Sequence, residues 1–459
     1  MTRIVEAALA AVLAVGVSPA WSQTAQEISY VANGVNAKLT CSGVFVSGRT
    51  PDAAALDAAT LLGPLGVGIE HALDPEAQSA SAHGGGVTRT AFYRPGLGCT
   101  LSADGAPPAL QSDPRSPGEA APAWSDAGPG RDVDADAIRA ALDAAFPAGA
   151  DIDTRAFVVV HDGRIVAERY APGFEPDTPL LGWSMAKSVT ATLIGLLIDD
   201  GRLSLSDPIA MPGWNEDNPR RAITLEQLLQ MSSGLTFTED YSGTDDASLM
   251  LFTRPDMAAY AASKPLEHAL GEVWSYSSGT TLMLSRLLIQ TLGSPEAVQA
   301  YARERLFIPA GMPGAVMEQD MAGTPVGSSY IYATAREWAR FGLLYLNGGE
   351  IDGRRILSPE WTGYARRPAP AARQANYGAQ FWLNGFRDTD RTTRVAPDLP
   401  TDTFFASGHS GQIVLIIPSL DVVVVRLGWT TGNARYSMNT VVPPVLEALG
   451  LLPAVPTTP

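Results

Sequence analysis

The chain has 459 residues, of which 46% are hydrophobic and 17% are charged. This length and composition are typical of a folded protein of two or three domains, and they exclude a peptide hormone, a disulfide miniprotein and a generally disordered chain. Acidic residues outnumber basic residues by 48 to 32, which gives a net charge of -16 at pH 7. This charge repels phosphate backbones and anionic membrane surfaces, so we expect neither nucleic acid nor a membrane as a partner.

The first residues have the pattern of an export signal. Arg3 precedes an apolar stretch over residues 7–17, and a small-x-small sequence ends at Ser22. This pattern predicts a signal peptide over residues 1–22, cleaved after Ser22, and a mature protein that is periplasmic or secreted without stable membrane insertion. Glu6 is unusual beside such a stretch, which leaves an uncleaved N-terminal helix as the alternative.

The chain contains two cysteines, Cys41 and Cys99. In an oxidising compartment, two cysteines on either side of one small segment most simply pair, so we expect a disulfide; two buried free thiols are the alternative. Two cysteines and five scattered histidines offer no metal-ligand spacing. We expect no metal and no organic cofactor.

After the signal, two parts precede the main domain. Residues 23–102 alternate short β-prone pieces, such as 43–46 and 88–93, with an alanine-rich segment around 51–62. We interpret this part as a small accessory region. Residues 103–131 are rich in proline, glycine and alanine and cannot bury enough apolar surface to order themselves, which is typical of a linker.

Residues 132–459 combine two hairpins with a helical middle. An Asp-Gly turn at 162–163 indicates the first hairpin, and Thr224, Ser294 and Thr334 are N-cap residues of three helices. The predicted strands are 157–160, 164–168, 412–417 and 422–427. The predicted helices are 134–145, 225–231, 280–288, 296–306, 335–346 and 442–449. We therefore predict an α/β (α+β) fold in which an antiparallel sheet is flanked by helices, with an all-helical insertion and the active cleft at their junction.

The most informative motif is Ser184-x-x-Lys187, which runs into an apolar helical pattern. A serine and a lysine three apart at a helix start share one face, so the lysine amine reaches the serine hydroxyl. The chain has two other lysines, Lys38 and Lys264, and otherwise uses arginine, which cannot lose its proton in a protein. Ser184 is therefore a candidate nucleophile and Lys187 its base; a surface lysine on an amphipathic helix is the alternative.

Two further segments are candidates for the same site. Tyr276, ahead of a helical run, would relay protons beside the Ser/Lys pair, although an ordinary half-buried aromatic residue is the alternative. His409, Ser410 and Gly411 enter a β-prone run, where small residues let a substrate carbonyl approach the backbone N–H donors of an oxyanion hole. A simple turn is the alternative for this segment.

Taken in this order, the three segments resemble the motifs of the serine β-lactamase and penicillin-binding-protein superfamily. The resemblance covers about residues 134–452. Within the superfamily, residues 228–235, 332–342 and 377–382 resemble the class C β-lactamase-related serine hydrolases. Ser-Met-Ala-Lys-Ser at 184–188 and Phe-Thr-Glu-Asp-Tyr at 237–241 are similar to the nylon-oligomer (6-aminohexanoate-dimer) hydrolases and related carboxylesterases.

The resemblance implies a role for each matched residue. Ser184 is the acylated nucleophile, Lys187 is its base, and Tyr276 shuttles protons through acylation and deacylation. The oxyanion hole consists of the backbone N–H groups of Ser184 and Gln412. The implied substrate contacts are Tyr241, Ser278, His409, Ser410 and Gly411. For Tyr241, a solvent-facing loop tyrosine is the alternative.

Two positions depart from the superfamily pattern. Ser278 stands where the motif has asparagine, and His409 stands where it has lysine. Loss of a permanent positive charge weakens recognition of a carboxylate, which argues against efficient β-lactam hydrolysis.

We therefore predict an exported serine hydrolase that cleaves a small ester or amide through an acyl-enzyme on Ser184. The alternative within the fold is a penicillin-binding-like D-stereospecific peptidase or weak β-lactamase. The alternative of another class is a non-catalytic binding or sensing protein, against which the joint retention of Ser184, Lys187 and Tyr276 argues. The partner we expect is a small-molecule substrate, and no oligomeric state is predicted.

Overall fold

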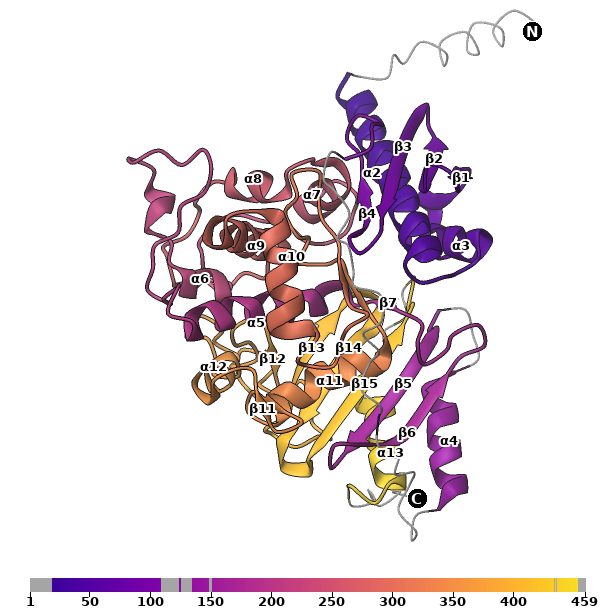
Figure 1. Cartoon of the computed structure of the whole chain (residues 1–459), viewed down its shortest axis with the longest axis vertical. Helices are drawn as coiled ribbons and strands as arrows, with labels where there is room; N and C mark the ends of the chain where they lie inside the picture. Colours follow the sequence, from indigo (N-terminus) through magenta and orange to yellow (C-terminus); the bar gives the residue numbers. More distant parts are fainter. Residues whose placement is uncertain are drawn as a thin grey trace, which may run out of the picture.

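A six-stranded antiparallel sheet forms the centre of the larger part of the molecule (Figure 1). The computed structural model describes residues 19–108, 124, 134–147, 151–432, 434 and 436–452. The strand order is β12-β13-β14-β15-β5-β6, so β5 from one side of the helical insertion pairs with β15 from the other, with Val159 opposite Val424. The strands are β5 (Thr154–His161), β6 (Arg164–Tyr170), β12 (Trp382–Leu383), β13 (Phe404–Gly408), β14 (Gln412–Ile417) and β15 (Val422–Gly428).

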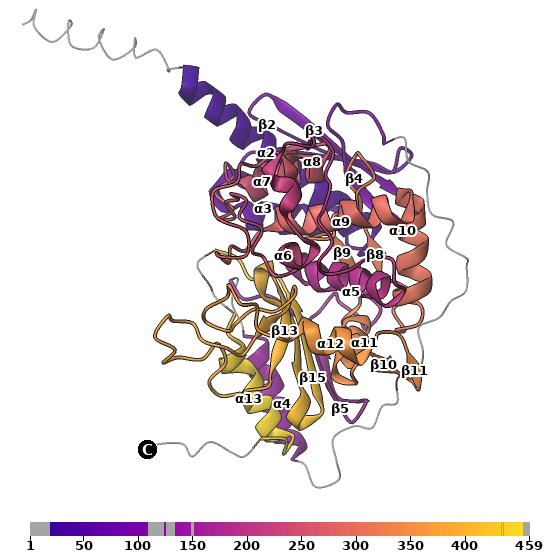
Figure 2. The same ribbon diagram turned by 90° about the vertical axis from the view of Figure 1, so that its left-hand side faces the viewer.

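Both faces of this sheet are covered by helices, which explains the continuous apolar runs in its strands. Val158 and Val160 join the main core beneath α11 (Ala335–Leu346), whereas Phe157 and Val159 join a second core. Two helices from opposite ends of the domain, α4 (Ala135–Ala145) and α13 (Met438–Ala448), cover that second face (Figure 2). The observed architecture is the predicted antiparallel sheet flanked by helices.

The helical insertion packs above one end of the sheet (Figure 1). Its helices are α5 (Ala186–Asp199), η3 (Pro219–Ala222), α6 (Leu225–Leu229), α7 (Asp246–Thr253), α8 (Met257–Ala262), α9 (Ser278–Leu292), α10 (Pro295–Ala302), the π-helical η4 (Arg303–Phe307) and α12 (Pro359–Ala365). Short strands in this part of the molecule lie outside the central sheet. β7 (Leu180–Leu181), β9 (Ile331–Ala333) and β8 (Val316–Met317) form a three-stranded sheet, and β10 (Glu350–Ile351) pairs with β11 (Arg354–Arg355). The predicted N-caps at Thr224, Ser294 and Thr334 are formed, and Thr224 and Thr334 each take part in a capping box.

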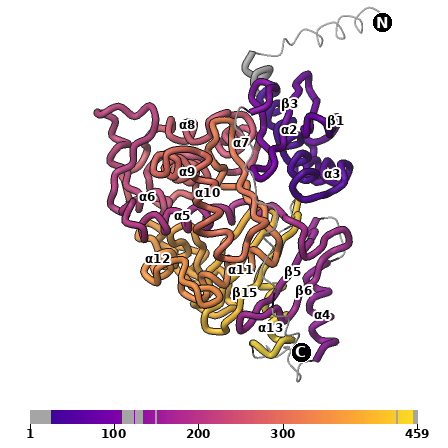
Figure 3. Tube along the Cα trace, in the orientation of Figure 1, coloured from indigo at the N-terminus to yellow at the C-terminus, as the bar shows by residue number. Residues whose placement is uncertain are grey.

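The accessory region is a four-stranded antiparallel sheet packed against one long helix (Figures 1 and 3). Its elements are α2 (Pro19–Phe45), α3 (Pro51–Leu62), η1 (Gly63–Gly66), β1 (Glu70–Asp74), β2 (Ser79–Gly84), β3 (Val87–Arg94) and β4 (Gly98–Leu101). The predicted disulfide between Cys41 and Cys99 is present and joins α2 to β4, with 6.1 Å between the two Cα atoms.

Buried polar contacts fix the accessory region to the rest of the chain. The Lys38 ammonium forms a fully buried ion pair with Glu318, and Glu318 Oε1 also accepts a hydrogen bond from the backbone N–H of Cys99 at 2.7 Å. On the other side, Asp57 of α3 accepts two hydrogen bonds from Arg155 of β5, at 2.6 and 2.9 Å. Because isolated buried charges are costly, these pairs hold the two parts in one defined arrangement.

Several predictions of local structure were wrong. Residues 43–46 were expected to be β-prone, but α2 extends to Phe45 because its buried face packs along the accessory sheet, and such packing overrides the propensity of a short run. The helix predicted over 225–231 ends at Leu229, and Met231 adopts a left-handed φ of 57°. The helix predicted over 296–306 becomes π-helical at Arg303, and the last helix begins at Met438 rather than 442.

Two predicted segments fall largely on residues that are not described. Residues 1–18 of the predicted signal peptide lie outside the described residues, and cleavage after Ser22 would fall in the first turn of α2. Most of the predicted linker over 103–131 also lies outside them. Among the helices that the structure describes, none is both long and apolar enough to span a bilayer.

Candidate active site

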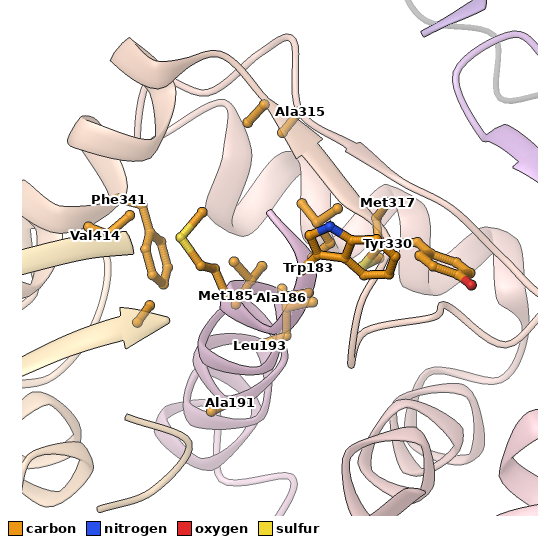
Figure 4. Packing of buried hydrophobic residues seen from close by; sticks show 14 of the residues in the cluster. Trp183, Met185, Ala186, Ala191, Leu193, Ala315, Met317, Tyr330, Phe341 and Val414 are labelled. Carbon is orange, nitrogen blue, oxygen red and sulfur yellow. The ribbon is translucent and has the colours of Figure 1, made fainter. Parts of the chain in front are cut away.

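Ser184 lies in η2 (Trp183–Met185), the tight turn that leads into α5. The residue before it, Trp183, has a φ of 47°, a strained conformation for a non-glycine residue that only firm packing maintains. Its indole supplies that packing, since it lies against Tyr330 with 6.2 Å between ring centroids (Figure 4). Position 182 requires glycine, because a Cβ there would come within 2.4 Å of the Trp338 ring. The backbone that carries Ser184 is therefore held rigidly.

The Lys187 side chain is buried and directed at the candidate nucleophile. Its Nζ lies 2.9 Å from Ser184 Oγ, 2.8 Å from Ser278 Oγ and 3.1 Å from the carbonyl oxygen of Ser328. Burial lowers the pKa of Lys187 to about 8, and the nearby Glu239 carboxylate opposes that effect. The amine is therefore partly deprotonated near neutral pH, as a general base requires.

The three contacts also orient the amine. A neutral amine has two N–H donors and one lone pair. The Ser328 carbonyl only accepts, and the Ser278 hydroxyl gives its own proton to Glu239 Oε1 at 2.7 Å, so both groups accept from Lys187. With both N–H groups held in this way, the lone pair remains for Ser184 Oγ.

Glu239 is the one carboxylate that contacts this hydrogen-bond network among the described residues. Its Oε1 lies 4.0 Å from Lys187 Nζ and accepts a hydrogen bond from the Tyr241 hydroxyl at 2.9 Å. Its Oε2 accepts a hydrogen bond from the backbone N–H of Ser278 at 2.6 Å. The segment 237–241 supported the family resemblance, but no role was predicted for Glu239. A loop residue 39 positions from Ser278 gives no local signal of this contact.

Tyr276 reaches the site from an aromatic cluster. The Tyr276 ring stacks on Trp382 with 5.5 Å between ring centroids and meets the Tyr377 ring edge-on at 6.1 Å. The Nζ atom of Lys187 lies 4.8 Å from the centroid of the Tyr276 ring. Burial and the charge of Glu239 raise the pKa of Tyr276 above its ordinary value, while a hydrogen bond with the Ser184 side chain acts in the opposite direction. The phenol therefore stays protonated at neutral pH.

The end of strand β13 lies beside Ser184. Gly408, at the end of β13, lies so close to the nucleophile that a Cβ there would come within 2.2 Å of the Gly182 carbonyl oxygen and 3.1 Å of the Ser184 nitrogen. Gln412 sits opposite Gly408 in the ladder, and its buried side chain is bonded to the backbone of Gly428. Gly408 therefore lies against the Ser184 nitrogen, and the part of the Gln412 N–H in the oxyanion hole stays a prediction.

A buried arginine supports the turn between these strands. Arg426 donates hydrogen bonds to the carbonyl oxygens of Ser410 at 2.8 Å and Gly411 at 3.0 Å, and its guanidinium lies 4.4 Å from the ring centroid of Tyr436. Burial lowers the pKa of Arg426 to about 10, so the group remains charged at neutral pH. This charge fixes the turn that contains His409.

The five predicted substrate contacts separate into two groups. Tyr241, His409, Ser410 and Gly411 line one cavity of about 540 Å³, whereas Ser278 bonds to Lys187 instead. The rings of Tyr241 and His409 lie 4.9 Å apart, and Tyr241 is 38% exposed, so it is neither a free loop residue nor a core residue. Within the described part of the chain, no three His, Cys, Asp or Glu side chains are grouped as a metal site would need.

Comparisons with known proteins identify relatives of this chain. The family described as Beta-lactamase, a family of serine hydrolases, matches residues 138–439. The 6-aminohexanoate-dimer hydrolase of Paenarthrobacter ureafaciens is 26% identical over 313 residues, which are 62% of this chain and 74% of that protein. A Bacillus anthracis structure assigned to the 6-aminohexanoate-dimer hydrolases is 25% identical, with a TM-score of 0.55 over 66% of this chain and 81% of its own.

A penicillin-binding-protein homologue from Caulobacter crescentus shares the fold, with a TM-score of 0.52 and 20% identity over 69% of this chain and 97% of its own. Together these findings confirm the predicted superfamily and the predicted fold class.

Proposed function

The chain belongs to the Beta-lactamase family, and from this premise we propose that it is an exported serine hydrolase that cleaves a small ester or amide through an acyl-enzyme on Ser184. One observation carries the proposal. The Lys187 amine lies 2.9 Å from Ser184 Oγ, has a pKa of about 8, and has both of its N–H groups directed to other acceptors.

Acylation begins at this pair. The Lys187 amine takes the proton of the Ser184 hydroxyl as Oγ attacks the substrate carbonyl carbon. The negative charge that develops on the carbonyl oxygen is stabilised by the backbone N–H groups of Ser184 and Gln412, the pair that the family resemblance implies. Collapse of this intermediate breaks the bond to the leaving alcohol or amine and leaves the acyl group on Ser184.

Tyr276 supplies the proton that the leaving group needs. Its phenol is protonated at neutral pH, interacts with the Ser184 side chain and lies over the Lys187 amine. It delivers its proton to the leaving group and recovers one from Lys187. In deacylation the same groups act in reverse on a water molecule, which releases the acid and regenerates Ser184.

The preference for a neutral ester or amide rests on the cavity beside Ser184. Among the described residues that line it, none is lysine or arginine, so it offers a substrate carboxylate no permanent positive charge. The sequence identity of 26% with a 6-aminohexanoate-dimer hydrolase supports an amide or ester as the bond that is cleaved. Export is supported by the N-terminal sequence pattern and by the Cys41–Cys99 disulfide, since disulfides persist in oxidising compartments.

A substrate panel tests the proposal. We expect wild-type protein to hydrolyse p-nitrophenyl acetate and a simple neutral anilide, and Ser184→Ala to lose this activity. Ser206→Ala, which replaces an exposed serine outside the site, should retain it. Faster turnover of a penicillin or a D-amino-acid peptide than of any ester would favour the peptidase or β-lactamase alternative, and no turnover by folded protein would favour a binding protein.

A further inference from the structure

We propose that the accessory region forms one wall of the substrate site and selects substrates that carry a neutral aliphatic chain. This inference rests on the proposed hydrolase function, because it assigns the part of the substrate that lies outside the reacting bond. It gives the accessory region, for which no motif indicated a role, a direct part in specificity.

The cavity lies next to the turn that carries Ser184 and is built from both parts of the chain. From the hydrolase domain, Trp183 directly precedes Ser184, and His409 directly follows Gly408, where a Cβ would lie 3.1 Å from the Ser184 nitrogen. The opposite wall comes from α2, α3 and η1, and its apolar side chains are Val31, Ala32, Val35, Leu61, Leu62 and Leu65. A volume of about 540 Å³ lies within the range of about 300–1,000 Å³ that is typical of small-molecule sites.

The mouth of this cavity carries exposed apolar side chains from both parts. Leu65 of η1 is 41% exposed and Tyr241 is 38% exposed, although both are large and apolar. The two segments approach closely, since a Cβ on Gly243 would lie 3.8 Å from Leu65 Cδ1. Side chains of this kind that converge on one opening indicate a contact surface for an apolar ligand.

The hydrolase side of the cavity adds polar groups. Its lining residues there include four with a side-chain hydroxyl: Tyr241, Ser248, Thr430 and Thr431. The cavity therefore matches a molecule with an aliphatic chain and a few neutral polar atoms.

The lining of the cavity disfavours an anionic chain. Asp240, an exposed residue, is the one carboxylate among the described lining residues, and no lysine or arginine is present among them to bind an anion. The accessory wall is uncharged. Burial of CH₂ groups is then the main source of binding energy on that side.

The wall is fixed rather than loosely tethered. The Lys38–Glu318 ion pair and the Asp57–Arg155 hydrogen bonds hold α2 and α3 in place, and the Trp429 indole also donates to the carbonyl oxygen of Asp57 at 2.9 Å. Because this wall is already ordered, little conformational entropy is lost when a substrate binds to it. Burial of the substrate's aliphatic chain should therefore increase the affinity for the transition state.

The number of CH₂ groups that the wall buries sets the size of the expected change in kcat/KM. Each CH₂ group that the wall buries contributes about 0.8 kcal/mol, which is about a fourfold change in kcat/KM. Extension of a bound chain from two to six carbons should therefore raise kcat/KM by up to about two orders of magnitude, until the chain reaches the mouth.

Two homologous ester series test the inference on the full-length protein. One series lengthens the acyl group of p-nitrophenyl esters, and the other lengthens the alcohol of alkyl acetates. The variant Leu65→Asp places a charge in the wall, and Leu65→Asn places an uncharged polar group there. The control Leu56→Asp makes the same change on α3 at a leucine that is 63% exposed and does not line the cavity.

We expect kcat/KM of wild-type protein to rise with chain length in at least one series. Both Leu65 variants should flatten that rise by at least tenfold for the longest chain, whereas Leu56→Asp should leave it unchanged. Active-site titration with a fluorophosphonate and thermal melting normalise each variant for folded, active protein.

A flat dependence on chain length in both series would overturn the inference, as would equal effects of Leu65→Asp and Leu56→Asp. Failure of the proposed function is a different result: wild-type protein would then hydrolyse no ester of any length and would take up no phosphonate at Ser184.

Discussion

Replacement of Glu239 by glutamine should extend activity to lower pH. In the wild-type protein, the fall of kcat/KM on the acidic side should follow protonation of Lys187, whose pKa is about 8. The Glu239 carboxylate favours the charged ammonium and therefore opposes formation of the neutral base. Glutamine removes the charge and keeps one oxygen that accepts a hydrogen bond, so the pKa of Lys187 should fall further.

The separation of the two groups sets the size of the effect. At 4.0 Å, the distance between Lys187 Nζ and Glu239 Oε1, two unit charges interact by about 4 kcal/mol at an effective dielectric constant of 20. This energy corresponds to about three pH units as an upper limit, because one unit is about 1.4 kcal/mol. Opposite charges at such distances typically move a titration by about 1–3 pH units, so the acidic limb should move down by at least one.

The assay is kcat/KM for p-nitrophenyl acetate between pH 5 and pH 9, since this parameter reports ionisations of the free enzyme. Glu216→Gln is the matched control, because it makes the same change at an exposed glutamate outside the site. It should leave the acidic limb within about 0.2 pH units of the wild type, as expected for a screened surface charge.

The account would be contradicted by an acidic limb that stays in place or moves to higher pH in Glu239→Gln. Loss of all activity with a normal melting temperature would mean that Glu239 has a role in the chemistry beyond its charge on Lys187.

Three further changes test other parts of the account. Tyr276→Phe should lower kcat for an anilide by about 10²–10⁴-fold but affect a p-nitrophenyl ester much less, because p-nitrophenolate leaves without a proton; equal losses would rule out proton delivery by Tyr276. Gly408→Ala should lower kcat/KM by about 10²–10³-fold through displacement of the strand beside the Ser184 N–H, whereas Gly363→Ala, where a Cβ meets no atom within 4 Å, should not. Full activity in Gly408→Ala would show that this strand does not bind the oxyanion. Glu318→Gln should destabilise the protein by about 3–5 kcal/mol in urea unfolding because it leaves Lys38 buried without its carboxylate, and the double change with Lys38→Met should restore part of that loss; an unchanged midpoint would mean that the ion pair does not anchor the accessory region.

The central sheet and the reactive pair were predictable from the sequence because their signals are local. Continuous apolar runs such as 157–160 are what strands buried on both faces need, and the capping residues at Thr224 and Thr334 lie within four positions of the groups that they bond. Ser184 and Lys187 are one helical turn apart, so their contact follows from the helix alone.

The remaining parts of the site depend on contacts between distant segments. Ser328 acts through its backbone carbonyl, which every residue has, so no side chain marks it. Glu239 lies in a loop, and its contact with Ser278 depends on how α9 packs. The approach of Gly408 to the Ser184 nitrogen depends on how the end of β13 packs against the turn at Gly182, and no local pattern in the sequence marks it.

The role proposed for the accessory region could not be predicted from the sequence, because it too depends on contacts between distant segments. Leu61, Leu62 and Leu65 belong to an alanine- and leucine-rich segment that is typical of any small helix. Only the position of that segment across from Trp183 shows that these side chains line a cavity beside the candidate nucleophile.

The most direct test of the central claim is the intact mass of the protein after incubation with an alkyl fluorophosphonate, followed by peptide mapping. We predict one adduct per chain, located on Ser184, and no adduct on Ser184→Ala under the same conditions. An adduct on another residue would contradict the account, as would an unlabelled but folded wild-type protein in a reaction where a control serine hydrolase is fully labelled.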